Sequence, residues 1–181
     1  LALERPGFDY VFPSVKPSIY SYLGNYLGFT GYYNPLTGEA QANTTIPAFA
    51  RPFTVCHEIG HQLGYAKENE ANFAGYLSAS ASSNKAFQYS VYFDMYAYAG
   101  RYLYMIDSLA FKEVNQLLSP AVKQDRAELR AFFDRYSSPL EEVIDRLYAQ
   151  YLTANEQPSG KMSYNEVVAL LIAYYKKFGH L

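Results

Sequence analysis

Residues 52–64 read Pro52-Phe53-Thr54-Val55-Cys56-His57-Glu58-Ile59-Gly60-His61-Gln62-Leu63-Gly64, and the interpretation of the whole chain starts from this stretch. A proline at the first position of a helix costs no hydrogen bond, because the N–H that it lacks would have no partner there. A glycine readily adopts the left-handed conformation that ends many helices. The stretch therefore predicts a helix that begins at Pro52 and ends at Gly64.

The chain after Gly64 has a helical pattern almost throughout. Two segments, at 138–141 and 163–166, carry a serine three residues before a glutamate, which is the capping-box pattern of helix starts. A loop is expected at 155–161, where a proline and a glycine interrupt the pattern. The predicted helices span 67–81, 84–118 (one helix, or a pair bent at Gly100), 119 onward, 138–153 and 163–177.

The first 50 residues are rich in proline, glycine and tyrosine, and the prolines at 6, 13, 17, 35 and 47 break any long helix. We expect a short helix over 18–27, then a strand over 29–33, a turn over 34–39 and a returning strand over 42–46 that closes a hairpin. The predicted fold class is mainly α (α+β): one domain over 1–181, with an irregular, β-containing part at 1–50 and a helical part at 51–181.

Composition narrows the classes of function. The chain has 181 residues, of which 50% are hydrophobic and 18% charged, as expected for a globular domain. With Lys+Arg 15 against Asp+Glu 17, it shows no basic surface that would predict nucleic-acid binding. No run reaches the ~18 apolar residues of a membrane span. The sequence begins at Leu1 without methionine, and we interpret it as a piece of a longer protein.

The segment His57-Glu58-Ile59-Gly60-His61 carries the chemistry, because it matches the pattern H-E-x-x-H. Residues four apart lie on one face of a helix, about 5–6 Å from each other at Cβ. Two imidazoles placed in this way can bind one Zn²⁺. Glu58 projects beside the metal and can take a proton from a water molecule there. The motif predicts a zinc hydrolase with Glu58 as catalytic base.

Three other residues have more ordinary interpretations. Gly60 lies inside the predicted helix at a cost of ~1 kcal/mol relative to alanine, which suggests that a neighbouring element packs closely there. Cys56 points away from the two histidines and is expected to be a buried structural thiol. His180, the third histidine, is expected to be exposed in the C-terminal tail.

A catalytic zinc needs a third protein ligand and one open position. Glu68 and Glu70 follow soon after the motif, but residues two apart cannot share a helix face. Glu68 lies on the same helix face as Asn72, which could orient a metal ligand through a hydrogen bond without binding the metal itself. Glu70 aligns instead with Phe73 and its apolar neighbours. Periodicity alone leaves the choice between the two glutamates open.

The run from Glu68 to Asn72 resembles the E-x-x-A-[DN] signature on the second helix of gluzincin peptidases, which include the CAAX-processing and heat-shock proteases. This resemblance implies Glu68 as the third ligand, although Asn72 replaces the more usual aspartate and the spacing from His61 is unusually short. The antitoxin-cleaving regulatory peptidases, with E-x-E-A-N-x-F-A, are similar over Glu68 to Ala74.

Nearly the whole chain resembles a family of uncharacterised bacterial membrane proteins with a C-terminal zinc-peptidase-like domain. The resemblance includes residues 29–31, 35–40, 46–47, 52–58, 68–73 and 163–164. It implies a multi-helix membrane anchor upstream of Leu1 and a soluble domain outside the cytoplasmic membrane. It supplies no substrate.

The working hypothesis is a zinc metallopeptidase that cleaves a peptide or protein. The segment Asn43–Ile46 could be an edge strand that pairs with the substrate backbone, and Tyr164 could stabilise the oxyanion. The alternative is a non-catalytic, zinc-stabilised binding or metal-sensing domain, with Glu68 and Glu70 both engaged in a closed site. A metal-free structural domain is disfavoured, because a buried cluster of histidines and glutamates without metal is costly.

Overall fold

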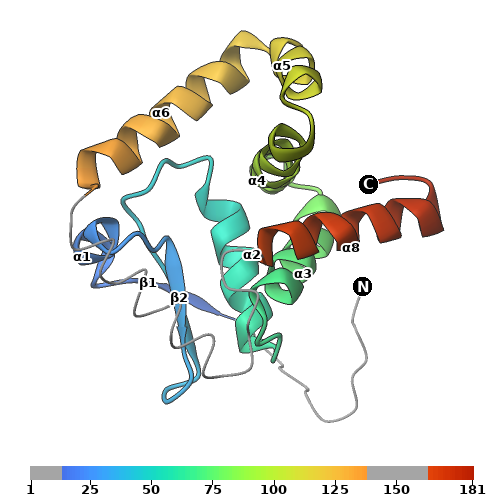
Figure 1. Cartoon of the computed structure of the whole chain (residues 1–181). Coiled ribbons are helices and arrows are strands. Elements are labelled where there is room, and N and C mark those ends of the chain that lie inside the picture. Colours follow the sequence, from blue (N-terminus) through green and yellow to red (C-terminus); the bar gives the residue numbers. More distant parts are fainter. Residues whose placement is uncertain (1–13, 138–162) are drawn as a thin grey trace.

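The computed structural model describes residues 14–137 and 163–181 (Figure 1). Within these ranges the chain forms seven helices and one three-stranded sheet, so the predicted mainly α fold with a small N-terminal β element is confirmed. The elements are β1 Val15–Pro17, α1 Ser21–Tyr26, β2 Gly31–Asn34, β3 Glu39–Ala42, α2 Arg51–Gln62, α3 Glu68–Ser80, α4 Lys85–Ile106, α5 Ser108–Gln116, α6 Pro120–Tyr136 and α8 Ser163–Phe178.

The sheet has the strand order β1-β3-β2 and lies on one side of α2 (Figure 1). Strands β2 and β3 form the predicted antiparallel hairpin, with Gly31 opposite Ala42. Gly38 has a φ of 69° in the connecting turn, a conformation that glycine adopts without strain. The parallel strand β1 was not predicted, because three residues that end in Pro17 carry no strand pattern.

The predicted strand at Asn43–Ile46 is wrong, because the returning strand ends at Ala42 and is central in the sheet. The chain turns at Asn43, whose side-chain oxygen accepts a hydrogen bond from the Thr45 N–H at 2.9 Å. The Asn43 amide also donates to Asn25 Oδ1 at 2.7 Å. Local side-chain bonds of this kind compete with a strand ladder and end it.

Helices α2 and α3 pack closely because each helix has a glycine on the face that contacts the other helix. A Cβ on Gly60 would lie 3.2 Å from the Ala71 carbonyl oxygen, and a Cβ on Gly75 would lie 3.3 Å from the backbone nitrogen of His57. The close neighbour predicted from Gly60 is therefore confirmed. The buried core continues from this contact through α4 and α8, and includes Phe53, Tyr76, Val91, Met95, Val167 and Leu171.

The predicted bend at Gly100 is wrong, because α4 runs through that residue to Ile106. The break comes at Asp107, whose carboxylate accepts hydrogen bonds from the Leu109 and Ala110 N–H groups and caps α5. Gly100 instead allows the Phe111 ring to approach, since a Cβ there would lie 2.9 Å from it. The predicted helix at 138–153 and loop at 155–161 lie outside the described residues. No helix in the described ranges is both long and apolar enough to cross a membrane.

Candidate metal centre

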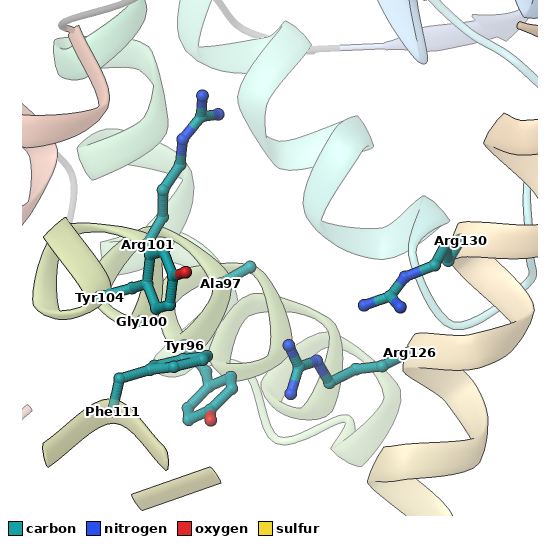
Figure 2. Close-up of a pocket in the computed structure, with 8 residues that line it drawn as sticks. All are labelled: Tyr96, Ala97, Gly100, Arg101, Tyr104, Phe111, Arg126 and Arg130. Carbon is teal, nitrogen blue, oxygen red and sulfur yellow. The ribbon is translucent and has the colours of Figure 1, made fainter. Parts of the chain in front are cut away.

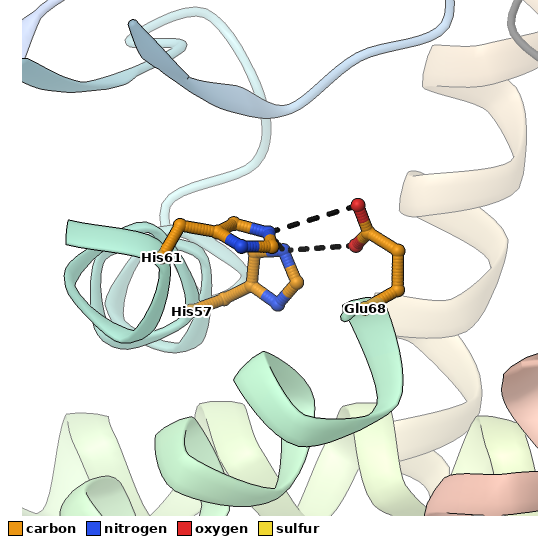
Figure 3. Close-up of side chains that lie close together, drawn as sticks. All are labelled: His57, His61 and Glu68. Atoms are coloured by element: carbon orange, nitrogen blue, oxygen red, sulfur yellow. Dashed lines mark hydrogen bonds and ion pairs between the residues drawn. The ribbon is translucent and has the colours of Figure 1, made fainter. Parts of the chain in front are cut away.

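The H-E-x-x-H segment lies on α2, and α3 begins only a few residues later. The two helices bring His57, His61 and Glu68 together, with one ligand atom from each residue all within 4.8 Å of one another. Figure 3 shows the two imidazoles and the carboxylate pointing toward a common centre. The Nε2 atoms lie 3.3 Å (His57) and 3.6 Å (His61) from the Glu68 carboxylate oxygens.

The end of α2 fixes the orientation of the second imidazole. Gly64 has a φ of 94° and turns the chain back, so that the Tyr65 N–H donates to the Gly60 carbonyl at 3.1 Å. The Tyr65 carbonyl oxygen then lies 2.8 Å from Nδ1 of His61. A carbonyl only accepts, so Nδ1 carries the proton and Nε2 of the neutral ring presents a lone pair to the centre.

This donor set fits a cation. The Nε2 atoms of His57 and His61 lie 3.1 Å apart beside a carboxylate, which has no proton of its own when ionised. Acceptors gathered in this way repel one another unless a proton or a metal ion lies between them. Two imidazoles and one carboxylate are also a known ligand set of catalytic zinc.

The protein environment shifts the pKa of two of these groups. Burial alone would raise the pKa of Glu68, but hydrogen bonds and charge interactions with the two histidines outweigh it and hold the pKa well below its ordinary value. Burial likewise opposes protonation of His61, whose pKa is nevertheless raised by the neighbouring Glu68. The carboxylate is thus kept ionised and ready to bind a cation.

Glu58 is buried beside the two histidines, with 4% of its surface exposed. Burial raises the pKa of its carboxyl group to about 7, although both neighbouring imidazoles lower it. Its Oε2 has no hydrogen-bond partner among the described residues. The other side of the carboxyl group faces β2, where a Cβ on Gly31 would lie 2.5 Å from Oε1. A carboxyl group with a pKa near neutrality can take up and release a proton.

The other residues predicted for the site have different positions. Glu70 is exposed and outside the cluster, so of the two glutamates it is Glu68 that joins the histidines. Asn72 is buried one turn after Glu68 and accepts a hydrogen bond from the Tyr98 hydroxyl at 3.5 Å. The side chain of Tyr164 lies outside the described residues, and its role stays a prediction. Cys56 is buried and His180 exposed, as predicted.

Sequence reasoning missed two contributors to the site. The Tyr65 carbonyl is a backbone group, so its position cannot be predicted from residue types, apart from the turn that Gly64 before it indicates. Gly31 lies far from the motif along the chain, and its contact with Glu58 depends on how β2 packs against α2. Neither contact can be derived from spacing along one helix.

A concave region lies between α4, α5 and α6, away from these residues. It has a volume of about 330 Å³ and is lined by Tyr96, Ala97, Gly100, Arg101, Tyr104, Phe111, Arg126 and Arg130. Figure 2 shows the Arg101 guanidinium turned away from those of Arg126 and Arg130. Arg126 also lies over the Tyr96 ring, 5.3 Å from its centroid. The three cations therefore do not converge on one anion.

Comparison with known proteins gives a family and no activity. Over residues 1–172 the chain matches a family described as proteins of unknown function, DUF3810. No curated protein and no solved structure matches it. The resemblance to an uncharacterised family is thereby confirmed, whereas its zinc-peptidase character and membrane anchoring stay predictions. Because the match covers nearly all of the sequence, the chain belongs to the DUF3810 family of proteins of unknown function.

Proposed function

We propose that this chain is a zinc-dependent metallopeptidase. The observation that carries the proposal is the joint placement of four side chains. His57, His61 and Glu68 present their ligand atoms to one point, and Glu58 lies buried beside them with its pKa raised to about 7. A structural zinc site needs four protein ligands and no base, whereas a catalytic site needs three ligands and a proton acceptor.

In the proposed reaction His57, His61 and Glu68 hold the ion, which when bound makes a water molecule more acidic and polarises the scissile carbonyl. Glu58 accepts a proton from that water as the water oxygen forms a bond to the carbonyl carbon. Glu58 then gives the proton to the amine nitrogen as the carbon–nitrogen bond breaks. Its raised pKa suits both steps near neutral pH.

The sheet supports a peptide as the substrate. Strand β2 is at the edge of the sheet in the described part of the chain, so its outer backbone groups can pair with an extended peptide. Gly31 at the start of β2 touches the Glu58 carboxyl group, which puts this edge beside the proposed base. In this proposal the strand that pairs with the substrate backbone is therefore β2, and not the segment Asn43–Ile46.

The alternative is a zinc-stabilised domain without activity. It predicts a closed site in which Glu70 joins Glu68. Glu70 is exposed on α3, outside the three-residue cluster. This position favours the catalytic proposal, since three ligands leave a coordination position open.

The test is cleavage of a diverse peptide mixture by the zinc-loaded chain, followed by mass spectrometry, with Glu58→Gln as the matched variant. Glutamine keeps the shape of the side chain but cannot accept the proton, so we expect activity to fall by about 10²–10⁴-fold while zinc is retained. Equal cleavage by both proteins would show that Glu58 is not the base. Zinc binding without any cleavage by the wild type would favour the non-catalytic alternative.

We also propose, from the family resemblance, that this domain works outside the cytoplasmic membrane, held there by a segment upstream of Leu1. Its substrate would then be an extracytoplasmic peptide or protein. Protease accessibility of the domain in spheroplasts that express the full-length protein tests this location. Digestion without lysis is expected, and protection until lysis would contradict it.

A further inference from the structure

His57 has a ring nitrogen that the metal centre does not use. Its Nε2 faces His61 and Glu68, whereas its Nδ1 is buried and has no hydrogen-bond partner among the described residues. A buried polar group without a partner is costly, so a hydrogen-bond acceptor is expected close to Nδ1 of His57. His61 meets the same need through the Tyr65 carbonyl.

Helix α4 packs against α2 and against the residues just before it. The ring of Phe49, just before α2, lies against the ring of Tyr89, with centroids 6.4 Å apart. One turn later, the backbone N–H of Phe53 donates to Ser90 Oγ at 3.0 Å. Phe49 also contacts Phe93, with ring centroids 5.0 Å apart, so this part of α4 lies against the start of α2.

The Phe53–Ser90 hydrogen bond lies one helical turn before His57 on α2. His57 follows Phe53 by four residues, and Asp94 follows Ser90 by four, so both lie one helical turn further on the same faces. Asp94 is half-buried, and this burial raises the pKa of its carboxyl group to about 7, while the charge of the nearby His57 lowers it. The two side chains are therefore near enough for their charges to influence each other across the helix contact.

We propose that Asp94 is the positioning residue for His57, and that its carboxylate accepts a hydrogen bond from the His57 Nδ1–H, directly or through one water molecule. This bond keeps the proton on Nδ1 and turns the Nε2 lone pair toward the metal. The inference deepens the proposed metallopeptidase function and rests on it. Asn72, which the sequence suggested for such a role, has its oxygen engaged with Tyr98.

Two substitutions separate this role from packing or charge. Asp94→Asn keeps a hydrogen-bond acceptor of the same size without the charge, and Asp94→Leu keeps the approximate size without an acceptor. We expect zinc affinity, measured by competition with a chelating dye, to fall by about 10–100-fold in Asp94→Leu and by less in Asp94→Asn. Glu70→Gln removes an exposed charge near the site and is expected to leave the affinity unchanged.

A second readout needs no metal. The chain has three histidines, so ¹⁵N NMR of the metal-free protein can follow each ring. At mildly alkaline pH we expect His57 to carry its proton on Nδ1 in the wild type and in Asp94→Asn. In Asp94→Leu a mixture of tautomers is expected, because the neutral ring then has no preferred acceptor.

Equal zinc affinity in the wild type and Asp94→Leu, or an unchanged His57 tautomer in Asp94→Leu, would overturn the proposal. Equal losses in Asp94→Leu and Asp94→Asn would also overturn it, since charge and not acceptance would then be the cause. A His61→Ala variant in the same zinc assay tests the metal centre itself. If His61→Ala bound zinc as the wild type does, the proposed function would fail, and the tautomer measurement would still decide the role of Asp94.

Discussion

The Nε2 atoms of His57 and His61 lie 3.1 Å apart, and their rings are nearly perpendicular at 89°. The Nδ1–H of His61 is committed to the Tyr65 carbonyl, so the ring cannot turn away without losing that bond. We therefore predict that the purified chain, once offered zinc, holds one zinc ion per chain. His61→Ala should lose it, as measured by elemental analysis after dialysis.

Two control pairs sharpen this prediction. His180→Ala removes an exposed histidine in the tail and should leave zinc binding intact. Glu68→Ala should lose zinc, whereas Glu70→Ala should keep it, because only Glu68 faces the imidazoles. Retention by Glu68→Ala together with loss by Glu70→Ala would mean that the ligand set is wrong.

Glu58 should make the metal-free protein less stable as the pH rises. Its folded-state pKa is raised from 4.5 to about 7, so between these values the folded chain binds more protons than the unfolded chain. Stability then falls with pH across this window and levels off above it. Glu58→Gln lacks this ionisation, and at pH above the window it should be more stable than wild type by on the order of 2 kcal/mol.

Urea unfolding of both metal-free proteins on either side of this window measures the effect. The two stabilities should be similar on the acid side and diverge on the alkaline side. A constant difference at every pH would mean that Glu58 is not an isolated buried acid in the folded chain. If the two stabilities diverge as expected, Glu58 is a buried acid that lowers stability at the pH at which it is proposed to act.

The sequence predicted the parts of the site that depend on one helix. The four-residue spacing of His57 and His61 and the glycine after them defined α2 and its histidine face. Periodicity did not decide between Glu68 and Glu70, because the result depends on how α3 turns back against α2. The resemblance to gluzincins favoured Glu68, and the structure puts Glu68 in the cluster.

The errors in the N-terminal part have a common physical cause. The position of β3 is set by pairing with β1 and by the side-chain bonds of Asn43, and both are contacts between distant or non-periodic residues. The break between α4 and α5 likewise comes from a specific contact, because the Asp107 side chain caps α5. Gly100 predicted a bend from its flexible backbone alone, but α4 continues through it. Local propensity does not report such contacts.

Gly31→Ala should disable Glu58 without removing the metal. The added Cβ would lie 2.5 Å from Oε1 of Glu58 and 2.8 Å from its Cγ, so the carboxyl group or β2 must move. We expect a loss of about 1–3 kcal/mol in stability, as for other overpacked sites, and most of the peptidase activity with it. In a Glu58→Ala background the same substitution should cost much less, since the clashing atoms are gone. Additive losses in the double mutant would contradict this contact.

Gly64→Ala should weaken zinc binding through the backbone. Gly64 has a φ of 94°, a conformation that costs alanine about 1–2 kcal/mol, and relief of this strain would displace the Tyr65 carbonyl from His61 Nδ1. Gly179→Ala is a matched control, because Gly179 has a φ of 78° and its added Cβ would meet nothing within 4 Å. Both variants should lose stability in thermal unfolding, but only Gly64→Ala should lose zinc affinity in the chelator competition. Equal zinc affinity in the two variants would show that the orientation of His61 does not depend on this turn.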